Sequence, residues 1–460
     1  MRSDLVVIGG GATGLGAAFE ARRRGASVTL VERGRLGGDC TWTGCVPSKA
    51  LLERAAEVAA ARRRGFTEPV DGARVLTEVR GAIAEVARDE SEQLLARIGI
   101  TVCTGDAVLE KAGHVTVDGQ TVTAQKVVIA TGSQPVVPPA LLDAKPITSD
   151  DVFELQRPPG SLAVVGGGPV GVEPGQAFAR LGTTVTLVQA SDRLLPREEP
   201  ETSQAILDAL VADGVDVRLA TTVASSDSDR VSLDDGSSLH VDRVLAAAGR
   251  QPVSESLGLA NAGVATAPDG AVVVDERLRT SVNGVFAAGD VTGAPFLTHL
   301  GYEEGRVAAA NALTRRPRRP DTSVLPWAVF TAPEVGRVGM TEAQAHAAHG
   351  ASARVAYVPM RRSDRARAVG HMNGFVKLVA GRRFPLGHLG GGRLLGATVV
   401  CPTGGDVVHE AAVLMRSGAL TGRLAQTVHA YPSWSLAVRQ AAAQFFRAEA
   451  GGTARLARPG

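Results

Sequence analysis

Two cysteines, Cys40 and Cys45, are separated by four residues and stand just before a helix-forming run at residues 50–57. Proline is tolerated in the first turn of a helix, so Pro47 predicts that a helix begins here with Cys45 at its amino end. The partial positive charge at that end favours a thiolate over a thiol. Lys49 lies four residues after Cys45, so its ammonium can stabilise a thiolate or a reduced, anionic cofactor ring. The spacing therefore favours a redox-active dithiol.

Two other uses of this cysteine pair remain open from the residues alone. A structural disulfide across so short a loop would add little stability to a chain of 460 residues. A zinc site usually has further cysteine or histidine ligands nearby, and none follows in this segment. We predict no resident metal site. Cys103 and Cys401 lie in strand-like runs and are interpreted as buried fillers.

A glycine-rich turn near the amino terminus predicts a dinucleotide site. A strand, a glycine turn, a helix and a second strand follow one another over residues 5–32. Gly9 permits the turn, Gly11 lets the backbone approach a pyrophosphate, and Gly14 lets helix and strand pack closely. The amino end of the helix then faces the phosphates. Glu32 falls about 20 residues on, where a carboxylate can accept hydrogen bonds from a ribose.

The same pattern returns over residues 162–189 and predicts a second dinucleotide site. Gly166, Gly168 and Gly171 repeat the glycine spacing, and a helix and a strand follow. Two copies indicate two dinucleotides rather than one. A carboxylate at the strand end favours the free 2′-hydroxyl of NAD, and nearby arginines favour the 2′-phosphate of NADP. Gln189 stands at this position and leaves the choice between the two nucleotides open. Two downstream arginines could reach a phosphate or could lie on the solvated surface, namely Arg193 and Arg197.

Shorter motifs mark strand ends and joins. Residues 127–132 read as a buried strand that ends in small residues, and residues 135–139 form a proline-rich crossing typical of a domain boundary. A strand ending at Gly289-Asp290 brings a carboxylate where it can hold a polyol hydroxyl, although Gly-Asp is also a common turn. From Trp327 onward the pattern becomes α+β. Strand-like residues 374–379 and 396–400 alternate there with helical residues 406–417, and a final helix is expected over about 435–448.

The composition fits a globular protein of about three domains at about 150 residues each. Hydrophobic residues make up 44% and charged residues 21% of the chain, and the net charge is +2. This balance gives no reason to expect a nucleic-acid partner, so the basic stretch 315–320 is interpreted as a solvated linker. No run of about 18 apolar residues predicts a membrane span. Four cysteines and no evident signal peptide fit a reducing, cytoplasmic location.

The chain resembles the two-dinucleotide flavoprotein disulfide reductases. The motifs that carry this resemblance are both glycine turns, the cysteine pair, Ala130-Thr131-Gly132, Gly289-Asp290 and the Thr-Ala-Pro-Glu run at 331–334. This family, the class I pyridine nucleotide-disulfide oxidoreductases, includes dihydrolipoamide dehydrogenase, glutathione reductase and mercuric reductase. The resemblance implies an α/β fold with two Rossmann-like domains, for FAD and NAD(P), and a C-terminal α+β dimerisation domain. The implied boundaries are 1–150 for the FAD domain with the cysteine pair, 151–275 for the NAD(P) domain, 276–325 for a segment returning to the FAD domain, and 326–460 for the interface domain.

The resemblance also implies roles for individual residues. Cys45 would meet the flavin, Cys40 would meet the substrate, and Lys49 would pair with Glu173 beside the flavin N5. Electrons would pass from nicotinamide to flavin, then to the Cys40–Cys45 disulfide, then to an acceptor. The implied cofactor-binding set is Gly9, Gly11, Ala12, Thr13, Gly14, Glu32, Arg33, Gly38, Asp39, Lys49, Ala130, Thr131, Gly132, Gly166, Gly168, Pro169, Val170, Gly171, Gln189, Gly249, Arg250, Gly289 and Asp290.

The chain departs from the family pattern near its carboxyl end. Dihydrolipoamide and glutathione reductases carry a His-Pro there and a Glu a few residues later, contributed by the partner subunit as the base. Here Tyr431 occupies the histidine position and Leu436 the glutamate position. A phenol titrates near about 10 and is a poor substitute at neutral pH. His429 is interpreted as a structural residue rather than a displaced base. Mercuric reductase also has a tyrosine in this region, but this chain lacks that enzyme's carboxyl-terminal cysteine pair and amino-terminal metal-binding domain.

We therefore expect a homodimeric, FAD-dependent NAD(P)H:acceptor oxidoreductase with Cys40, Cys45, Lys49, Glu173 and Tyr431 in its catalytic set. The expected acceptor is a small molecule that needs no His-Glu base, such as an unusual small disulfide, a quinone or a metal ion. One alternative is a dihydrolipoamide dehydrogenase that tolerates the substitution. An alternative of another class is a redox sensor whose dithiol state controls a partner.

Overall fold

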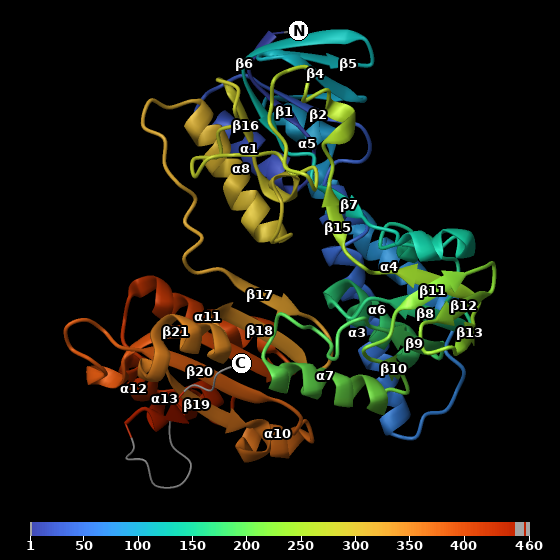
Figure 1. The fold of residues 1–460 in the computed structure, drawn as a ribbon, viewed down its shortest axis with the longest axis vertical. Coiled ribbons are helices and arrows are strands. Elements are labelled where there is room, and N and C mark those ends of the chain that lie inside the picture. The colour runs from blue at the N-terminus through green and yellow to red at the C-terminus, as the bar shows by residue number, and fades with distance from the viewer. Residues whose placement is uncertain (1, 447–454, 457–460) are drawn as a thin grey trace.

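Three main β-sheets with their helices, and two small antiparallel sheets, organise the chain in the computed structural model, which describes residues 2–446 and 455–456 (Figure 1). The sheet of the first unit lies at the top of the view, the second unit at the right and the third at the lower left. Two helices that belong to the first unit by sequence, α3 (Cys45–Arg63) and α4 (Gly72–Ala87), lie beside the second unit and share its core. The expected α/β class, with two Rossmann-like units and a C-terminal α+β unit, is confirmed. Among the described residues, no helix has the length and apolar character needed to cross a membrane.

The first unit contains a seven-stranded sheet with the order β3-β2-β1-β6-β5-β4, and β16 also pairs with β6. Strands β3, β2, β1, β6 and β16 run parallel. Helical crossovers join β1 to β2 and β2 to β3, as parallel neighbours require. Helices α1 and α8 pack side by side on one face (Figure 1). The strands are β1 Arg2–Ile8, β2 Val28–Glu32, β3 Ile100–Thr104, β4 Ala107–Lys111, β5 His114–Val117, β6 Gln120–Ile129 and β16 Val285–Ala287. The helices are α1 Ala12–Arg23, α2 Gly38–Trp42, α3 Cys45–Arg63, α4 Gly72–Ala87, α5 Glu92–Arg97 and α8 Thr298–Ala312.

The second unit repeats the strand, glycine turn and helix around a four-stranded parallel sheet of order β10-β9-β8-β14. A small antiparallel sheet, β11-β12-β13, lies beside it. The strands are β8 Ser161–Val165, β9 Thr184–Val188, β10 Asp216–Arg218, β11 Val223–Ser226, β12 Arg230–Leu233, β13 Ser238–His240 and β14 Arg243–Ala246, and the helices are α6 Pro169–Leu181 and α7 Pro200–Ala212.

A two-stranded ribbon joins these two units. Strand β7, Ser133–Pro135, leads out of the first unit, and strand β15, Arg250–Pro252, leads back, and the two pair in antiparallel fashion. The proline-rich crossing expected at residues 135–139 begins at this ribbon. After it, β16 returns to the first sheet beside β6, so the second unit is an insertion within the first.

The third unit is an antiparallel sheet of order β17-β18-β21-β20-β19-β22. Its strands are β17 Pro326–Val329, β18 Glu334–Gly339, β19 Arg354–Pro359, β20 Phe375–Gly381, β21 Arg393–Cys401 and β22 Arg455–Leu456, and its helices are α9 Glu342–His349, α10 Asp364–Val369, α11 Gly404–Ser417, α12 Gly422–Gln426 and α13 Leu436–Gln444. Helices α11, α12 and α13 share one apolar core with the sheet. The final helix is shorter than the expected 435–448, and residues 447 and 448 lie outside the described residues.

A buried ion cluster fastens the third unit to the second. Lys377 on β20 is 1% exposed, and its Nζ lies 2.7 Å from Glu201, 3.0 Å from Glu342 and 3.2 Å from Glu199. Burial opposes the ammonium charge, but the carboxylates, Glu199 first, raise the pKa of Lys377 above its ordinary value. The Glu198 carboxylate lies 3.0 Å from Arg337 in a second buried pair. These contacts fix the loop before α7 against the third sheet.

Replacing the buried ammonium should loosen this joint. Lys377→Met leaves Glu199 and Glu342 buried without their cation, which should cost about 3–5 kcal/mol of stability. We expect a lower midpoint of urea unfolding, followed by tryptophan fluorescence. Lys111→Met removes an exposed lysine from β4 and should leave the midpoint unchanged. Equal midpoints for both variants would show that the cluster does not hold the units together.

Candidate active site

The first glycine turn leaves bare backbone where a phosphate can approach. Gly9 has a φ of 107°, which favours glycine, and a Cβ on Gly14 would lie 1.8 Å from the Gly9 carbonyl oxygen. A Cβ on Gly11 would meet only the Gly38 Cα, at 3.7 Å, so this stretch of backbone faces open space. Helix α1 begins at Ala12, and the Thr13 hydroxyl lies against Gly289. The residues therefore fit the pyrophosphate of a dinucleotide.

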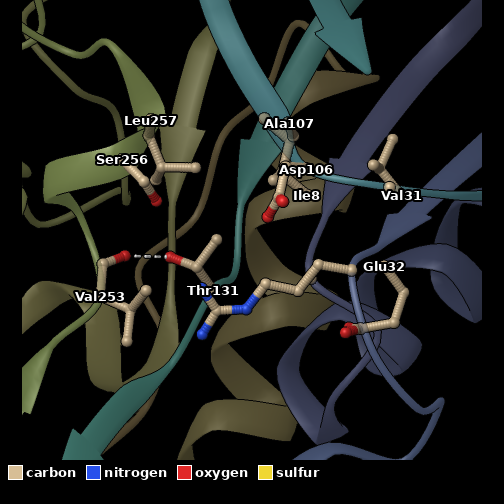
Figure 2. Close-up of a pocket in the computed structure, with 12 residues that line it drawn as sticks. Ile8, Val31, Glu32, Asp106, Ala107, Thr131, Val253, Ser256 and Leu257 are labelled. Carbon is tan, nitrogen blue, oxygen red and sulfur yellow. Dashed lines mark hydrogen bonds between the residues drawn. The ribbon is translucent and has the colours of Figure 1, made fainter. Parts of the chain in front are cut away.

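The carboxylate at the end of β2 is oriented by backbone amides. Glu32 accepts hydrogen bonds from the N–H of Gly10, at 2.6 Å, and of Gly34, at 2.7 Å. A cavity of about 60 Å³ opens beside it (Figure 2). Arg33, Asp106 and Ala107 line this cavity, and so does Thr131, whose hydroxyl donates to the Val253 carbonyl at 2.6 Å. The oriented Glu32 carboxylate fits the ribose hydroxyls of a dinucleotide such as FAD.

A polar chain crosses from the ribbon to the strand ends of the first sheet. The Ser133 hydroxyl donates to Asp290 at 2.7 Å and accepts from Arg250 Nε at 2.7 Å. Arg250 also pairs with Asp39. Burial raises the pKa of Asp290, although the Ser133 hydrogen bond opposes the rise. Gly132 and Gly249 accept from Val253 N and Val136 N beside the same ribbon, and the Ala130 carbonyl abuts Gly9.

Cys40 and Cys45 lie together as free thiols, Cys40 in α2 and Cys45 at the first position of α3, as Pro47 predicts. A hydrogen bond from Cys40 lowers the pKa of Cys45 to about 6, and the Thr298 hydroxyl, 3.3 Å from its Sγ, and Lys49 act in the same direction. The same hydrogen bond and burial raise the pKa of Cys40. The reduced pair therefore holds one shared proton, on Cys40, and a thiolate on Cys45 at neutral pH.

The predicted ion pair between Lys49 and Glu173 is present, with Nζ 2.8 Å from Oε2. Glu173 also accepts from Phe330 N at 2.9 Å, and the Lys49 ammonium lies 4.3 Å from the centre of the Phe330 ring. Helix α3 supplies the lysine, α6 the glutamate and the segment after β17 the phenylalanine. The three units thus meet at one fixed positive charge.

A cavity of about 630 Å³ joins these features. Cys45 and Lys49 line one wall, and Pro169, Val170 and Glu173 line another. Thr298 at the start of α8 and Trp327, Phe330 and His409 of the third unit complete it. The volume lies within the usual range for cofactor sites, and the walls of the cavity come from all three units. It fits a flavin ring with a nicotinamide beside it.

The second glycine turn has the same geometry as the first. Gly166 has a φ of 122°, and a Cβ on Gly171 would lie 1.9 Å from the Gly166 carbonyl oxygen. A Cβ on Gly168 would meet nothing within 4 Å, so the backbone is again bare. Gln189 accepts from Gly167 N at 2.7 Å. The residues fit a second dinucleotide at this turn.

Two residues of the carboxyl-terminal segment do not reach either cavity of the same chain. Tyr431 is 73% exposed, and its hydroxyl donates to Asp364 at 3.2 Å, a bond that raises the pKa of the phenol. His429 has Nε2 2.6 Å from Glu410 and Nδ1 2.9 Å from the Thr427 carbonyl oxygen. Because both ring nitrogens face acceptors, His429 fits the structural role that its position predicts.

The other two cysteines lie apart from the dithiol. Cys401 is fully buried in β21, and burial raises its pKa to about 11, so it is an inert filler as expected. Cys103 is not buried as expected: it is only half-buried in β3, where it packs against the edge of an apolar core. No group of three or more metal-ligating side chains that could hold an ion occurs in the described part of the chain.

Sequence reasoning missed Thr298, Phe330 and Ser133, which touch the thiolate, the lysine and Asp290. Thr298 lies 253 residues from Cys45 in the sequence, so no local spacing signals their contact. Phe330 directly precedes the Thr-Ala-Pro-Glu run, and that run could have drawn attention to it.

The causes of the low Cys45 pKa can be ranked by mutation. In the reduced protein we expect thiolate absorbance to titrate with a midpoint near 6. Cys40→Ala should raise this midpoint most, Thr298→Val less, and Lys49→Met least. The reason is that the Cys40 hydrogen bond lowers the pKa of Cys45 most, the Thr298 hydrogen bond less and the Lys49 charge least. Cys103→Ser is the control and should not shift it. A midpoint that stays near 6 in Cys40→Ala would contradict the shared proton.

Comparison with known proteins places the chain in a family. Residues 3–311 match the family model described as pyridine nucleotide-disulphide oxidoreductase, and residues 325–442 match its dimerisation domain. The chain is 37% identical to a mercuric reductase of Streptomyces lividans and 34% identical to dihydrolipoyl dehydrogenase 2 of Haloarcula marismortui, with 96% of each chain covered in both cases. It is also similar to a solved Cu(II) complex of RclA, a HOCl-induced flavoprotein disulfide reductase from Escherichia coli, with a TM-score of 0.86, 28% identity, and coverage of 96% of this chain and 99% of RclA. The chain therefore belongs to the pyridine nucleotide-disulphide oxidoreductases, enzymes that use FAD and NAD(P)H.

Proposed function

We propose that this protein is an NAD(P)H:acceptor oxidoreductase whose Cys40–Cys45 pair delivers electrons to a thiophilic metal ion. The single cavity that joins Cys45, the Lys49–Glu173 pair and the start of α6 carries this proposal. A thiol pair, a fixed cation and a nucleotide turn share that space. Electrons can therefore pass over short distances from the second nucleotide cleft to sulfur.

The residues around the two cavities would hold the cofactors. FAD would lie along the first glycine turn, with Glu32 at the ribose and Asp290 at the ribityl chain, and NAD(P)H would lie on the second turn. When bound, FAD supplies the two-electron chemistry that links nicotinamide to a disulfide. Lys49, held by Glu173, keeps a positive charge at the ring end, which favours an anionic reduced ring.

The dithiol step balances without an outside base. The Cys40–Cys45 disulfide takes up two electrons and one proton and becomes a Cys40 thiol and a Cys45 thiolate. In the second half of the cycle the two sulfurs bind the acceptor, pass two electrons to one Hg(II) ion or to two Cu(II) ions, and re-form the disulfide. The Cys40 proton leaves to water. The environments of the two thiols support this division of charge.

The missing base favours an acceptor that releases no thiolate. Tyr431 carries a raised pKa, Leu436 cannot ionise, and both nitrogens of His429 face acceptors. A metal ion bound by thiolates needs no proton to leave, and soft sulfur ligands select such ions. The mercuric reductase relatives and the Cu(II) complex of RclA support this choice among the possible acceptors.

Dihydrolipoyl dehydrogenase activity is the second candidate. The 34% identity to the Haloarcula enzyme over 96% of both chains favours it. It would require the dithiol itself, rather than a histidine of the partner subunit, to protonate the leaving thiol.

Acceptor assays separate these functions. We expect the FAD-loaded protein to oxidise NAD(P)H with catalytic turnover when Cu(II) or Hg(II) is the acceptor, measured by loss of nicotinamide absorbance. Cys40→Ser and Cys45→Ser should each lower this rate by at least about 100-fold, because a lone thiol cannot form the disulfide. Cys103→Ser is the matched control and should retain the wild-type rate.

Three results would contradict the proposal. Faster turnover with lipoamide than with either ion would identify a dihydrolipoyl dehydrogenase. Reduction in one stoichiometric step without turnover would favour the redox sensor. Unchanged metal reduction in both serine variants would show that the dithiol does not carry the electrons.

We also propose that the protein is a homodimer that pairs through the helical layer of the third unit. The matched dimerisation domain supports this, and so do apolar side chains that this layer leaves exposed, among them Val413 at 69% and Val428 at 89%. Free thiols and the absence of a disulfide scaffold support a reducing, cytoplasmic location.

A charge at this layer should separate the subunits. Val413→Asp combined with Val428→Asp places two carboxylates in the proposed interface, so we expect a monomer by light scattering after size exclusion. Val211→Asp changes a valine that is 57% exposed on α7 and should leave the dimer intact. If the double variant is still a dimer, the interface lies elsewhere on the molecule.

A further inference from the structure

Two histidines line the cavity that contains Cys45. His299 stands at the start of α8 in the first unit, and His409 lies on α11 in the third. Both residues are exposed, and both border the same open space. His299 directly follows Thr298, whose hydroxyl lies 3.3 Å from the Cys45 Sγ. One imidazole is therefore next to the residue that contacts the thiolate, and the other faces the same cavity from another unit.

Each imidazole is held by a hydrogen bond to a backbone carbonyl. His409 Nδ1 lies 3.3 Å from the Asp406 carbonyl oxygen. Because a carbonyl only accepts, Nδ1 carries the proton and Nε2 keeps its lone pair. The Pro326 carbonyl accepts from the ring of His299 in the same way. Histidines that bind metals usually make such a bond through their other nitrogen, because it fixes the ring and its tautomer.

The two rings are close enough to influence each other. Burial lowers the pKa of His299, and the charge of His409 acts in the same direction, against the hydrogen bond to the Pro326 carbonyl. His299 is therefore neutral at neutral pH and offers a lone pair to the cavity. A neutral imidazole nitrogen is a common metal ligand.

An exposed carboxylate beside the pair attracts cations. Asp406 lines the cavity three residues before His409 and, within the described part of the chain, forms no ion pair. Lys49 and Arg250 also line the cavity, but each of these cations is paired with a carboxylate. A cation that enters the cavity thus meets an uncompensated negative charge next to His409.

We propose that His299 and His409 bind Cu(II) in the cavity beside Cys45 and so set the affinity of the protein for this acceptor. The inference rests on the proposed function, since it names the ion and the residues that hold it first. Imidazole suits copper, and Cu(II) binds a given set of nitrogen ligands more tightly than the other first-row divalent ions do. The ion passes to the dithiol by ligand exchange: bonds to nitrogen break, bonds to sulfur form, and no electron moves until the ion lies on sulfur.

Two protein ligands suit an ion that is a substrate. No group of three or more metal-ligating side chains that could hold an ion occurs among the residues that the structure describes, so the pair does not close a coordination shell. The positions left to water let the ion exchange its ligands. The pair can therefore hold Cu(II) and still release it to Cys45.

Electron spin resonance of bound Cu(II) tests the pair without electron transfer. The FAD-loaded protein is used with Cys40 and Cys45 oxidised to their disulfide, so that these sulfurs cannot take the ion. Cys103→Ser is included in every sample, so that this thiol does not compete. We expect one bound Cu(II) per chain, with a spectrum that shows coupling to two nitrogen nuclei.

Variants assign the two nitrogens. His299→Asn and His409→Asn keep an N–H for the backbone carbonyl and lose the ligand nitrogen. Each should weaken Cu(II) binding by at least about tenfold, because even the loss of a ligand's outer hydrogen bond costs that much. In turnover, each should raise the KM for Cu(II) by a similar factor. His349→Asn changes an exposed histidine on α9, outside the cavity lining, and should alter neither the spectrum nor this KM.

The inference is overturned if the wild-type spectrum shows no nitrogen coupling, if both variants bind Cu(II) as tightly as the wild type, or if neither changes the KM. It is also overturned if His349→Asn weakens binding as much as the other two variants, because the ion then binds surface histidines in general. Unchanged urea midpoints check that the variants stay folded. A protein that shows the two-nitrogen spectrum but does not reduce Cu(II) would contradict metal reduction alone, since the spectrum is recorded without an electron donor.

Discussion

The ion pair between Lys49 and Glu173 is the contact on which the arrangement of the site depends. Lys49 comes from the helix that begins with Cys45, and Glu173 comes from the helix that follows the second glycine turn. The other carboxylate oxygen of Glu173 accepts a hydrogen bond from the backbone N–H of Phe330 in the third unit. A buried carboxylate is costly unless its hydrogen bonds are satisfied, and the first and third units supply the two groups that satisfy Glu173 of the second. Sulfur, charge and nucleotide turn therefore stay in register only when all three units are assembled.

The parts of this arrangement that the sequence predicts are those that local spacing encodes. The glycine turns, the helix start at Pro47 and the acid at Glu32 each follow from the geometry of one strand, one turn and one helix. The resemblance to a family added the pairing of Lys49 with Glu173, which lie 124 residues apart. The contacts of Thr298 and Ser133 could not be predicted, because they arise only where elements of different units meet. The proton shared by Cys40 and Cys45 could not be predicted from the sequence either, because it depends on burial and on the Thr298 hydroxyl of α8.

The two glycine turns have nearly the same backbone geometry, and the side chains around them differ. Their backbone torsions and close contacts nearly repeat, so the geometry that accepts a pyrophosphate is set by glycine alone. What distinguishes the clefts is a side chain outside the turn: the Glu32 carboxylate in the first and the Gln189 amide in the second. The loop that follows Gln189 also belongs to the joint with the third unit, because Glu198 pairs there with Arg337.

The ribbon of β7 and β15 has a consequence for how such a molecule can change over evolutionary time. Because its two strands are hydrogen-bonded neighbours, the chain leaves the first sheet and re-enters it at almost the same point. Everything between them can be lengthened, shortened or exchanged for another folded module without moving an end of the host sheet. A lineage could therefore exchange the inserted unit, provided that the new unit again presents a carboxylate to Lys49, as Glu173 does here.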